Sequence, residues 1–256
     1  MASTQVNPQE LEAKVKDVYR HVAEEPGGDY HFELGRALAD RLGYPADVID
    51  AIPEGAVESF AGVGYFFDLA ELKEGETVVD LGSGSGMDVF FAAAQVGPTG
   101  RVVGVDFTAE QLEKALRLAE GNGFDQVELR EGRIESLPVD DASCDCVISN
   151  GVINLAPNKE RVFSEAARAL RPGGRLAIAD IVSEHELKES IVCNADLWAS
   201  CIGGAAQQDA YRAAIESAGL RIDDLRDNPY EFISERARSA SAKYGVKSVS
   251  LLARKE

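Results

Sequence analysis

Two aspartates and a run of alternate glycines form the most chemically suggestive group in this 256-residue chain. Asp80 lies in the apolar run 77–81, and Asp106 ends a second apolar run, 101–105, about 20 residues beyond the glycines. The glycines are Gly82, Gly84 and Gly86. Glycine permits positive φ and close approach of a ligand to the backbone, and a carboxylate placed like Asp106 can accept hydrogen bonds from ribose hydroxyls. The spacing therefore predicts a nucleoside site.

Two kinds of cofactor compete for such a site. A dinucleotide site has Gly-x-Gly-x-x-Gly spacing and places a pyrophosphate at a helix N-terminus. Here the glycines alternate, and Asp80 would repel a phosphate, whereas it can help to order an ammonium group. We therefore expect S-adenosyl-L-methionine, with S-adenosyl-L-homocysteine as its product. The remaining alternative is a strand–helix–strand crossover that binds no ligand.

Short apolar runs alternate with amphipathic segments on both sides of this site. Strands are expected at 77–81, 101–105, 126–131, 144–149 and 175–181, and helices at 87–95, 109–120 and 158–170. This alternation predicts an α/β fold with a doubly wound, mainly parallel sheet. Later elements are helices at about 188–200 and 207–218, strands near 220–226 and 246–253, and a helical insert at about 230–242.

Residues 1–73 are expected to form a helical cap that leans over the cofactor. Apolar positions at helical spacing predict a helix over 8–23, and a second helix is expected from Phe32 to Leu42, where Gly43 provides the C-terminal cap. No low-complexity linker follows. The cap is therefore expected to continue directly into a cofactor-binding domain at 74–256 that contains the helical insert.

Other polar and aromatic residues near the glycines are candidates for cofactor contact. Phe107 could cover one face of an adenine, and Ser83 lies within the glycine run. Thr108 and Gln111 have the spacing of a capping box at the start of a helix, and Gln111 is also placed to reach the cofactor. Asn150 ends the fourth expected strand, so its backbone carbonyl is expected near the methionine tail.

The charge and the apolar content of the chain limit the kinds of partner that we expect. The formal net charge of −18 argues against nucleic acid, because phosphates would be repelled. No apolar run reaches membrane-spanning length, and the N-terminal residues do not form a signal peptide. We therefore expect a cytoplasmic protein with reduced cysteines and a small-molecule substrate. No histidine or cysteine spacing suggests a metal site, and oligomeric state is beyond the sequence.

Four motifs in order, DLGSGSG, GVD, LPVDDASCDCVISNGVINL and LRPGGRLAIAD, resemble class I S-adenosylmethionine-dependent methyltransferases over residues 74–182. Within that class the chain is most similar to bacterial arsenite methyltransferases, and DLWASCIGGA extends the likeness to about residue 205. The resemblance implies methyl transfer to a small-molecule acceptor. It also implies that Ile134 and Glu135 contact the edge of the adenine.

The arsenic family holds its substrate with three cysteines, and this sequence keeps only one of them, Cys201, the expected acceptor-binding thiol. Val63 and Gly151 stand at the other two positions. Because arsenic(III) is soft and selects thiolates, we expect arsenite to be a poor substrate. Cys193, eight residues before Cys201, could border the same pocket.

Cys144 and Cys146 alternate on an expected strand and are interpreted as core residues on one face of the sheet.

The expected reaction is direct displacement at the sulfonium methyl, with alignment and exclusion of water supplied by the protein. An oxygen or carbon acceptor would need a base, for which Glu58, His185 and Glu186 are candidates. Tyr19 could reach the cofactor, and Trp198 is expected in the core or a pocket wall. The alternatives are a small-molecule C-, O- or S-methyltransferase with a non-arsenic acceptor, and a non-catalytic S-adenosylmethionine-binding protein.

Overall fold

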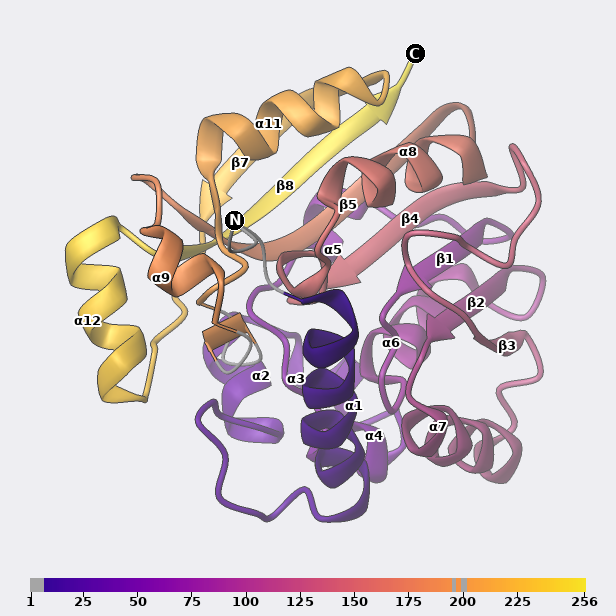
Figure 1. Cartoon of the computed structure of the whole chain (residues 1–256). Coiled ribbons are helices and arrows are strands. Elements are labelled where there is room, and N and C mark those ends of the chain that lie inside the picture. Colours follow the sequence, from indigo (N-terminus) through magenta and orange to yellow (C-terminus); the bar gives the residue numbers. More distant parts are fainter. Residues whose placement is uncertain (1–6, 195–196, 199–201) are drawn as a thin grey trace.

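The computed structural model describes residues 7–194, 197–198 and 202–256 (Figure 1). Within them one sheet has the strand order β3-β2-β1-β4-β5-β8-β7, and β6 pairs with β5. The strands are β1 (Thr77–Leu81), β2 (Arg101–Asp106), β3 (Val127–Glu131), β4 (Cys144–Asn150), β5 (Leu170–Ser183), β6 (Ala206–Gln207), β7 (Leu220–Asp227) and β8 (Lys247–Lys255). Only β8 runs antiparallel to its neighbours β5 and β7. The predicted mainly parallel sheet is therefore confirmed.

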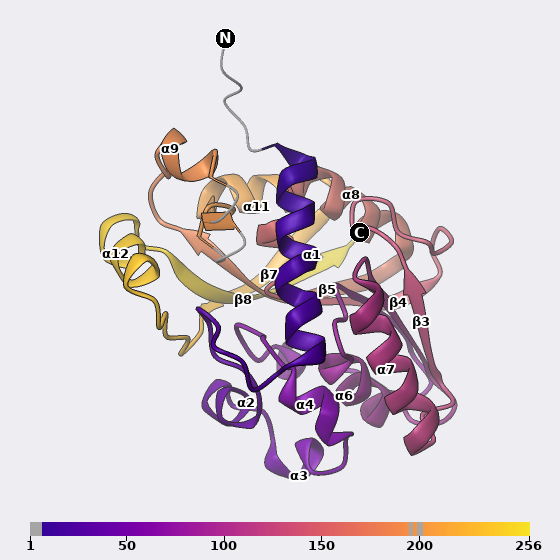
Figure 2. The ribbon, with the colours of Figure 1, turned by 60° about the horizontal axis from the view of Figure 1, so that its bottom comes forward.

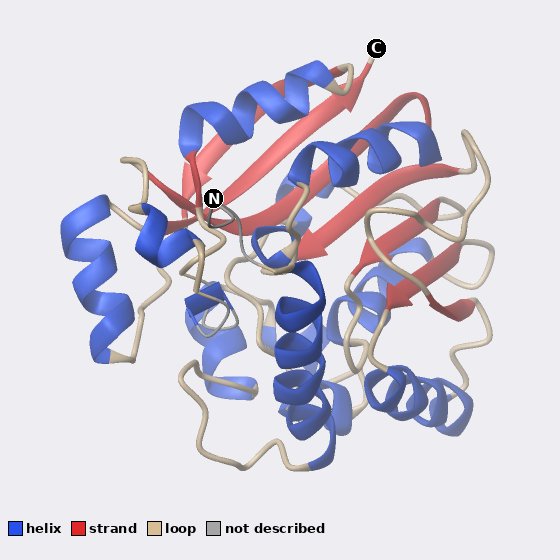
Figure 3. Cartoon of the chain, viewed as in Figure 1, coloured by secondary structure: helices blue, strands red, loops and turns tan. Residues whose placement is uncertain are grey.

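Helices cover both faces of this sheet (Figure 3). One face packs against α6 (Met87–Val96) and α7 (Ala109–Asn122), and the other against α8 (Lys159–Ala169) and α11 (Gln208–Ser217). Adjacent residues of β1 enter different cores, Val78 on the α6 face and Val79 on the α8 face. Both faces are thus buried, which explains why the strand sequences are continuously apolar.

Between residue 7 and β1 the structure describes five short or medium helices: α1 (Pro8–Glu24), α2 (Arg36–Leu42), α3 (Ala46–Ile49), α4 (Glu54–Glu58) and α5 (Phe67–Ala70). Figure 2 shows α1 lying across the sheet beside α7. Leu11 and Val15 of α1 belong to the same apolar core as Val78 of β1. The described residues of this region therefore share an apolar core with the sheet.

Two helix boundaries differ from the sequence prediction. α2 begins at Arg36 rather than Phe32, because Gly35 precedes it with φ of 82° and ψ of −159°, which is outside the helical region. The helix expected at about 188–200 begins as α9 (Glu189–Val192) and is interrupted at Cys193. The predicted insert contains α12 (Glu235–Tyr244), and η1 (Ile153–Leu155) follows β4.

Cys144 and Cys146 are both fully buried, as a core role requires, but they lie on opposite faces of the sheet. The prediction of one shared face is wrong, and the pairing of β4 with β5 is irregular at the same place: Cys144 pairs with Leu170 and Cys146 with Arg175, so the extra residues lie in β5. Extra residues in one strand of a pair bend and twist the sheet locally, and strict alternation then no longer predicts the faces of neighbouring residues.

Among the described residues, no helix has both the length and the apolar character needed to span a bilayer.

Candidate cofactor-binding site

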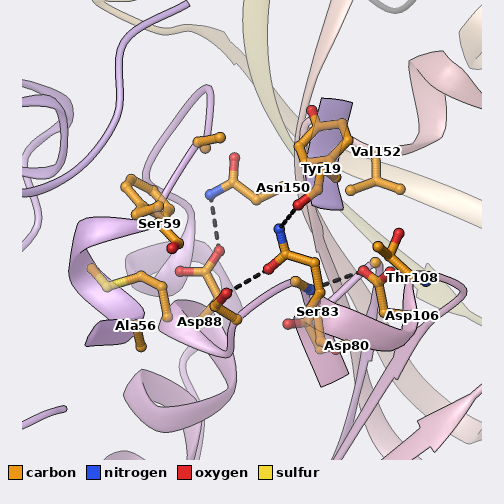
Figure 4. A pocket seen from close by; sticks show the side chains of 18 of the residues that line it. Tyr19, Ala56, Ser59, Asp80, Ser83, Asp88, Asp106, Thr108, Asn150 and Val152 are labelled. Atoms are coloured by element: carbon orange, nitrogen blue, oxygen red, sulfur yellow. Dashed lines mark hydrogen bonds between the residues drawn. The ribbon is translucent and has the colours of Figure 1, made fainter. Parts of the chain in front are cut away.

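A pocket of about 700 Å³ opens where β1, β2 and β4 end, and a second pocket of about 600 Å³ adjoins it. Gly82, Asp106 and Phe107 line both. All ten residues predicted to bind cofactor line one or both pockets: Asp80, Gly82, Ser83, Gly84, Asp106, Phe107, Gln111, Ile134, Glu135 and Asn150. Figure 4 shows Asp80, Ser83, Asp106 and Asn150 gathered around this space.

The glycine turn, residues 82–86, has the conformation that its sequence predicts. Gly82, Gly84 and Gly86 have φ values of 72°, 52° and 97°, which side chains other than glycine rarely adopt. A Cβ on Gly82 would lie 2.5 Å from Val152, so the close packing of this turn also excludes a larger residue. The backbone N–H of Gly84 donates to Asp106 Oδ2 at 2.9 Å, which ties the turn to the end of β2.

Asp106 keeps acceptor capacity for a ligand. Its Oδ1 accepts from the N–H of Thr108 at 2.8 Å and its Oδ2 from Gly84. An ionised carboxylate offers about four lone-pair sites, so further hydrogen bonds to ribose hydroxyls are available. Burial raises the pKa of Asp106, and the hydrogen bonds from Thr108 and Gly84 oppose that rise.

Three buried carboxylates line the first pocket: Asp80, Asp88 and Asp106. Burial raises the pKa of Asp80 well above its ordinary value, and the charges of Asp88 and Asp106 add to the rise. Burial also raises the pKa of Asp88 to about 6, against the hydrogen bonds from Tyr44 and Asn150. A ligand with a sulfonium and an ammonium group would offset these charges, whereas a pyrophosphate would add to them. The electrostatics therefore fit S-adenosylmethionine.

Two buried hydroxyls at the pocket also fit a polar ligand. Ser83 Oγ and Thr108 Oγ1 have no hydrogen-bond partner among the described residues, and both residues line the first pocket. Unpaired buried polar atoms are rare in folded proteins and often mark a ligand or water position. The capping box predicted for Thr108 is wrong, because its side chain makes no capping bond to α7.

Gln111 instead connects the glycine turn to the N-terminal helix. Its Nε2 donates to the carbonyl of Tyr19 at 2.7 Å, and its Oε1 accepts from the hydroxyl of Ser85. Nearby, the ammonium of Lys16 lies 5.1 Å from the centre of the Phe107 ring. α1 is therefore held directly over the two pockets, and Tyr19 lines the first of them.

The side chain of Asn150 has a role that the sequence analysis missed. Its Oδ1 accepts from the N–H of Val63 at 2.7 Å, and its Nδ2 donates to Asp88 Oδ2 at 3.0 Å. Tyr44 donates to Asp88 Oδ1 at 2.6 Å. Asp88 itself was also missed, although a carboxylate in the first turn of the helix after a glycine turn was a visible signal.

Val63 and Gly151 are neighbours: a Cβ on Gly151 would lie 3.1 Å from Val63 Cγ1. The two positions at which the resemblance implies cysteines are thus brought together beside the cofactor pocket. Cys201 lies outside the described residues. Cys193 is half-buried at the end of α9 and lines neither cofactor pocket.

The candidate bases Glu58, His185 and Glu186 are exposed and line neither cofactor pocket. Trp198 is buried, and its Nε1 donates to the carbonyl of Val192 at 2.6 Å. Lys159 Nζ lies 4.8 Å from its ring centre. Trp198 therefore belongs to the core and lines a pocket other than the two cofactor pockets.

Residues 72–219 match the sequence model of a family described as a methyltransferase domain. The match covers more than half of the chain, and the chain therefore belongs to this methyltransferase-domain family.

Similar proteins refine that class. The arsenite methyltransferase of Halobacterium salinarum is 42% identical over 211 residues, which cover 82% of this chain and 54% of that protein. The arsenite methyltransferase of Homo sapiens is 41% identical over 137 residues, which cover 50% of this chain and 36% of that protein. The chain spans about half the length, or less, of these curated relatives.

Solved structures agree with this class. An arsenic(III) S-adenosylmethionine methyltransferase from Chlamydomonas reinhardtii has a TM-score of 0.64 at 30% identity and covers 86% of this chain and 73% of its own. A geranyl diphosphate C-methyltransferase from Streptomyces coelicolor has a TM-score of 0.70 at 18% identity, covers 98% of this chain and 100% of its own, and shows the fold alone. The predicted fold class and the predicted resemblance to arsenite methyltransferases are confirmed, and these similarities support S-adenosylmethionine as the cofactor.

Proposed function

We propose that this chain transfers the methyl group of S-adenosylmethionine to a small-molecule acceptor other than trivalent arsenic. The observation that carries the proposal is the contact between Val63 and Gly151, where the resemblance implies two of the three arsenic-binding thiols. A valine methyl and a glycine offer no soft ligand. The two positions are close enough to bind one arsenic atom together, but neither side chain has a group that can coordinate it.

The other described cysteines do not replace those thiols. Burial raises the pKa of both Cys144 and Cys146 to about 12. At neutral pH they are therefore protonated core residues, whereas the thiolate is the form that binds a metalloid. Among the described residues, no cysteine lines either cofactor pocket.

The proposed roles in cofactor binding follow from position. Asp106 accepts hydrogen bonds from the ribose hydroxyls, and Asp80 faces the ammonium of the methionine tail. Phe107, Ile134 and Glu135 surround the adenine in the second pocket. Ser83, Gly84 and Gln111 line the space beside them, and the Asn150 carbonyl is placed at the end of β4.

Bound S-adenosylmethionine supplies an electrophilic methyl group on a positively charged sulfur. The chain contributes alignment and exclusion of water, both of which lower the barrier to a direct displacement. Val15 and Tyr19 of α1 line the first pocket from above, so α1 shields the site from solvent. Ala61 and Gly62 line it from the side on which Val63 meets Gly151, and we assign the acceptor to that side.

The net charge of the chain bears on its partners. The net charge of −18 disfavours binding to nucleic acid or to an anionic membrane. We therefore retain a cytoplasmic location and a small-molecule substrate as part of the proposal.

The test is formation of S-adenosylhomocysteine from S-adenosylmethionine with a panel of acceptors: arsenite with glutathione, a simple thiol, a catechol and an acidic carbon compound. We expect turnover with at least one organic acceptor and little with arsenite. Asp106→Ala is the control for a disabled cofactor site.

Two outcomes would contradict the proposal. Efficient arsenite methylation that Cys201→Ser abolishes would restore the arsenic chemistry. Tight binding of S-adenosylmethionine by calorimetry without turnover of any acceptor would indicate a non-catalytic binding protein.

A further inference from the structure

Residues 61–65 form a segment, here called the acceptor wall, whose backbone is held by side chains instead of a neighbouring strand. The carbonyl of Val63 accepts from Ser248 Oγ at 2.6 Å, and that of Tyr65 from Ser250 Oγ at 3.0 Å. On the opposite side, Asn150 bonds the backbone of Val63 and Gly64. Buried backbone groups need such partners. The position of the acceptor wall therefore depends on these few side chains.

Asn150 makes the largest contribution, because its amide bonds both donors and acceptors of the wall. Its Oδ1 accepts from the N–H groups of Val63 and Gly64, at 2.7 and 3.3 Å. Its Nδ2 donates to the carbonyl of Gly64 at 3.0 Å. If this amide rotated by half a turn, like groups would face each other at every one of these contacts. Its orientation therefore decides whether the wall is held.

Asp88 fixes that orientation. Asp88 Oδ2 lies 3.0 Å from Asn150 Nδ2, and Figure 4 shows the two side chains pointing toward each other. Tyr44 donates to the other carboxylate oxygen at 2.6 Å. An ionised carboxylate only accepts hydrogen bonds, so it selects the NH₂ end of Asn150 and leaves Oδ1 for the wall.

The wall has little room to move without affecting the pocket. A Cβ on Gly62 would lie 2.6 Å from Asn150 Nδ2, and one on Gly64 would lie 2.1 Å from Asn228 Nδ2. Ala61 and Gly62 line the first pocket, and Val63 contacts Gly151. A shift of about 1 Å in groups that align reactants can lower a rate by a large factor.

We propose that Asp88 is a positioning residue for methyl transfer: its ionised carboxylate orients the Asn150 amide, and Asn150 holds the acceptor wall at the distance that methyl transfer requires. The inference rests on the proposed function for its catalytic consequence. Its structural part, the dependence of the wall on Asp88, can be measured with S-adenosylhomocysteine alone. Nothing in the role requires Asp88 to touch the acceptor.

Protonation should release the wall. A protonated Asp88 carries a donor on one oxygen, so Tyr44 or Asn150 loses its acceptor. The groups that face Asp88 are Tyr44 from the N-terminal region, Asn150 from β4, and the charge of Asp80 from β1. Because burial raises the pKa of Asp88 to about 6, we expect the acceptor wall to loosen as the pH is lowered through about 6, which is experimentally accessible.

A second buried cluster provides a matched control. Asp180 accepts from Tyr211 Oη at 2.6 Å and from Asn154 Nδ2 at 2.7 Å, so it has the same two kinds of partner as Asp88. Asp180 is also fully buried. No hydrogen bond joins it to the acceptor wall among the described contacts.

The experiment measures hydrogen exchange of the Val63 and Gly64 amides in the full chain saturated with S-adenosylhomocysteine. In Asp88→Asn we expect both amides to exchange about tenfold faster or more, the effect of losing one hydrogen bond to a charged group. Asp180→Asn should leave them near the wild-type rates. In wild type, protection corrected for intrinsic exchange should fall below about pH 6, and in Asp88→Asn it should not depend on pH in that range.

Unchanged protection of both amides in folded Asp88→Asn would overturn the proposal, as would equal loss in the two variants. If Asp88→Asn does not fold, a flat wild-type pH profile of protection decides against it. With the panel acceptor that is turned over, and with S-adenosylmethionine at saturation, Asp88→Asn should lower kcat/KM for the acceptor about tenfold, whereas Asp180→Asn should leave it near the wild-type value. Absence of turnover in wild type would contradict the proposed function and leave the exchange result to decide the role of Asp88.

Discussion

Two buried clusters, each of a tyrosine, an aspartate and an asparagine, hold opposite ends of the turn after β4. Tyr44, Asp88 and Asn150 hold its start, and Tyr211, Asp180 and Asn154 hold its end. The tyrosine–aspartate distance is 2.6 Å in both. Their surroundings differ: Tyr44 and Val63 come from the N-terminal region, whereas Tyr211 comes from α11, which packs on the sheet.

The comparison separates burial from function. Burial raises the pKa of both Asp88 and Asp180, so the direction of the pKa shift does not distinguish the two clusters. Only the Asp88 cluster joins two parts of the chain that meet over the cofactor pocket. The Asp180 cluster joins elements that are already fixed by the sheet and by α8. A perturbed carboxylate therefore indicates a working role when its partners come from a segment that lines the site.

The largest expected effect is a loss of cofactor affinity in a variant outside both clusters, Asp106→Ala. Asp106→Ala should remove two hydrogen bonds from ribose hydroxyls to a charged acceptor, each contributing about 1.5–3 kcal/mol. We expect the Kd for S-adenosylhomocysteine, measured by calorimetry, to rise at least a hundredfold, by about 3 kcal/mol or more. Asp180→Asn should change this Kd far less. An Asp106→Ala variant with wild-type affinity would remove the cofactor assignment.

The next effect concerns stability and pH. The pKa of Asp88 is raised from 3.8 to about 6 in the folded chain, so its contribution to stability is greatest at low pH and is lost as pH rises through about 6. Two pKa units correspond to about 3 kcal/mol. The free energy of unfolding of Asp88→Asn, relative to wild type, should therefore increase by about that amount between pH 4 and pH 7.

Urea unfolding at each pH measures this difference. Parallel curves for the two proteins would show that Asp88 does not titrate in this range.

A conservative pair of variants sharpens the comparison. Tyr44→Phe and Tyr211→Phe each remove one buried hydroxyl that donates to an aspartate, and each should lower the free energy of unfolding by about 1–3 kcal/mol. Only Tyr44→Phe should also lower kcat/KM for the acceptor, because only its aspartate orients Asn150. Equal kinetic effects at matched stability losses would make the two clusters equivalent and contradict the distinction.

The smallest effect is expected at the other edge of the acceptor wall. Ser250→Ala removes a neutral hydroxyl whose one proton is shared between the carbonyl of Tyr65 and Asn228 Oδ1, a hydrogen bond worth about 1 kcal/mol. Arg226 also donates to that carbonyl at 3.1 Å, so the group keeps a partner. Thermal unfolding should shift by a few degrees, about what 1 kcal/mol produces in a chain of this size. A shift as large as that of Tyr44→Phe would mean that β8, and not Asn150, fixes the wall.

Much of the cofactor site follows from short-range patterns in the sequence. The glycine turn and Asp106 belong to one strand–helix–strand unit, so spacing alone predicts their meeting. The role of Asp88 depends on Tyr44, 44 residues earlier, and on Asn150, 62 residues later, and no local pattern records either contact. Gln111 was expected to cap α7, but the carbonyl of Tyr19 provides a tertiary partner that competes with the local one.

The errors in the fold have the same origin. Alternation on β4 predicts that Cys144 and Cys146 share a face, but they enter different cores at the place where β5, a neighbour later in the chain, carries extra residues in its pairing with β4. The boundary of α2 was placed too early because the unusual backbone of Gly35 is not visible in an apolar pattern. Periodicity finds elements well, but it does not report bulges or long-range partners.

The serines that hold the acceptor wall have a consequence for how the site is assembled during synthesis. Ser248 and Ser250 of β8 each bond a carbonyl that lies 185 residues earlier in the chain. A nascent chain that has reached α8 already contains the glycine turn, Asp106 and Asn150, but it lacks β8, whose serines bond the carbonyls of Val63 and Tyr65. Contacts between such distant residues close late in folding. Such a ribosome-bound chain therefore contains the residues of the nucleoside site before it contains every partner of the acceptor wall.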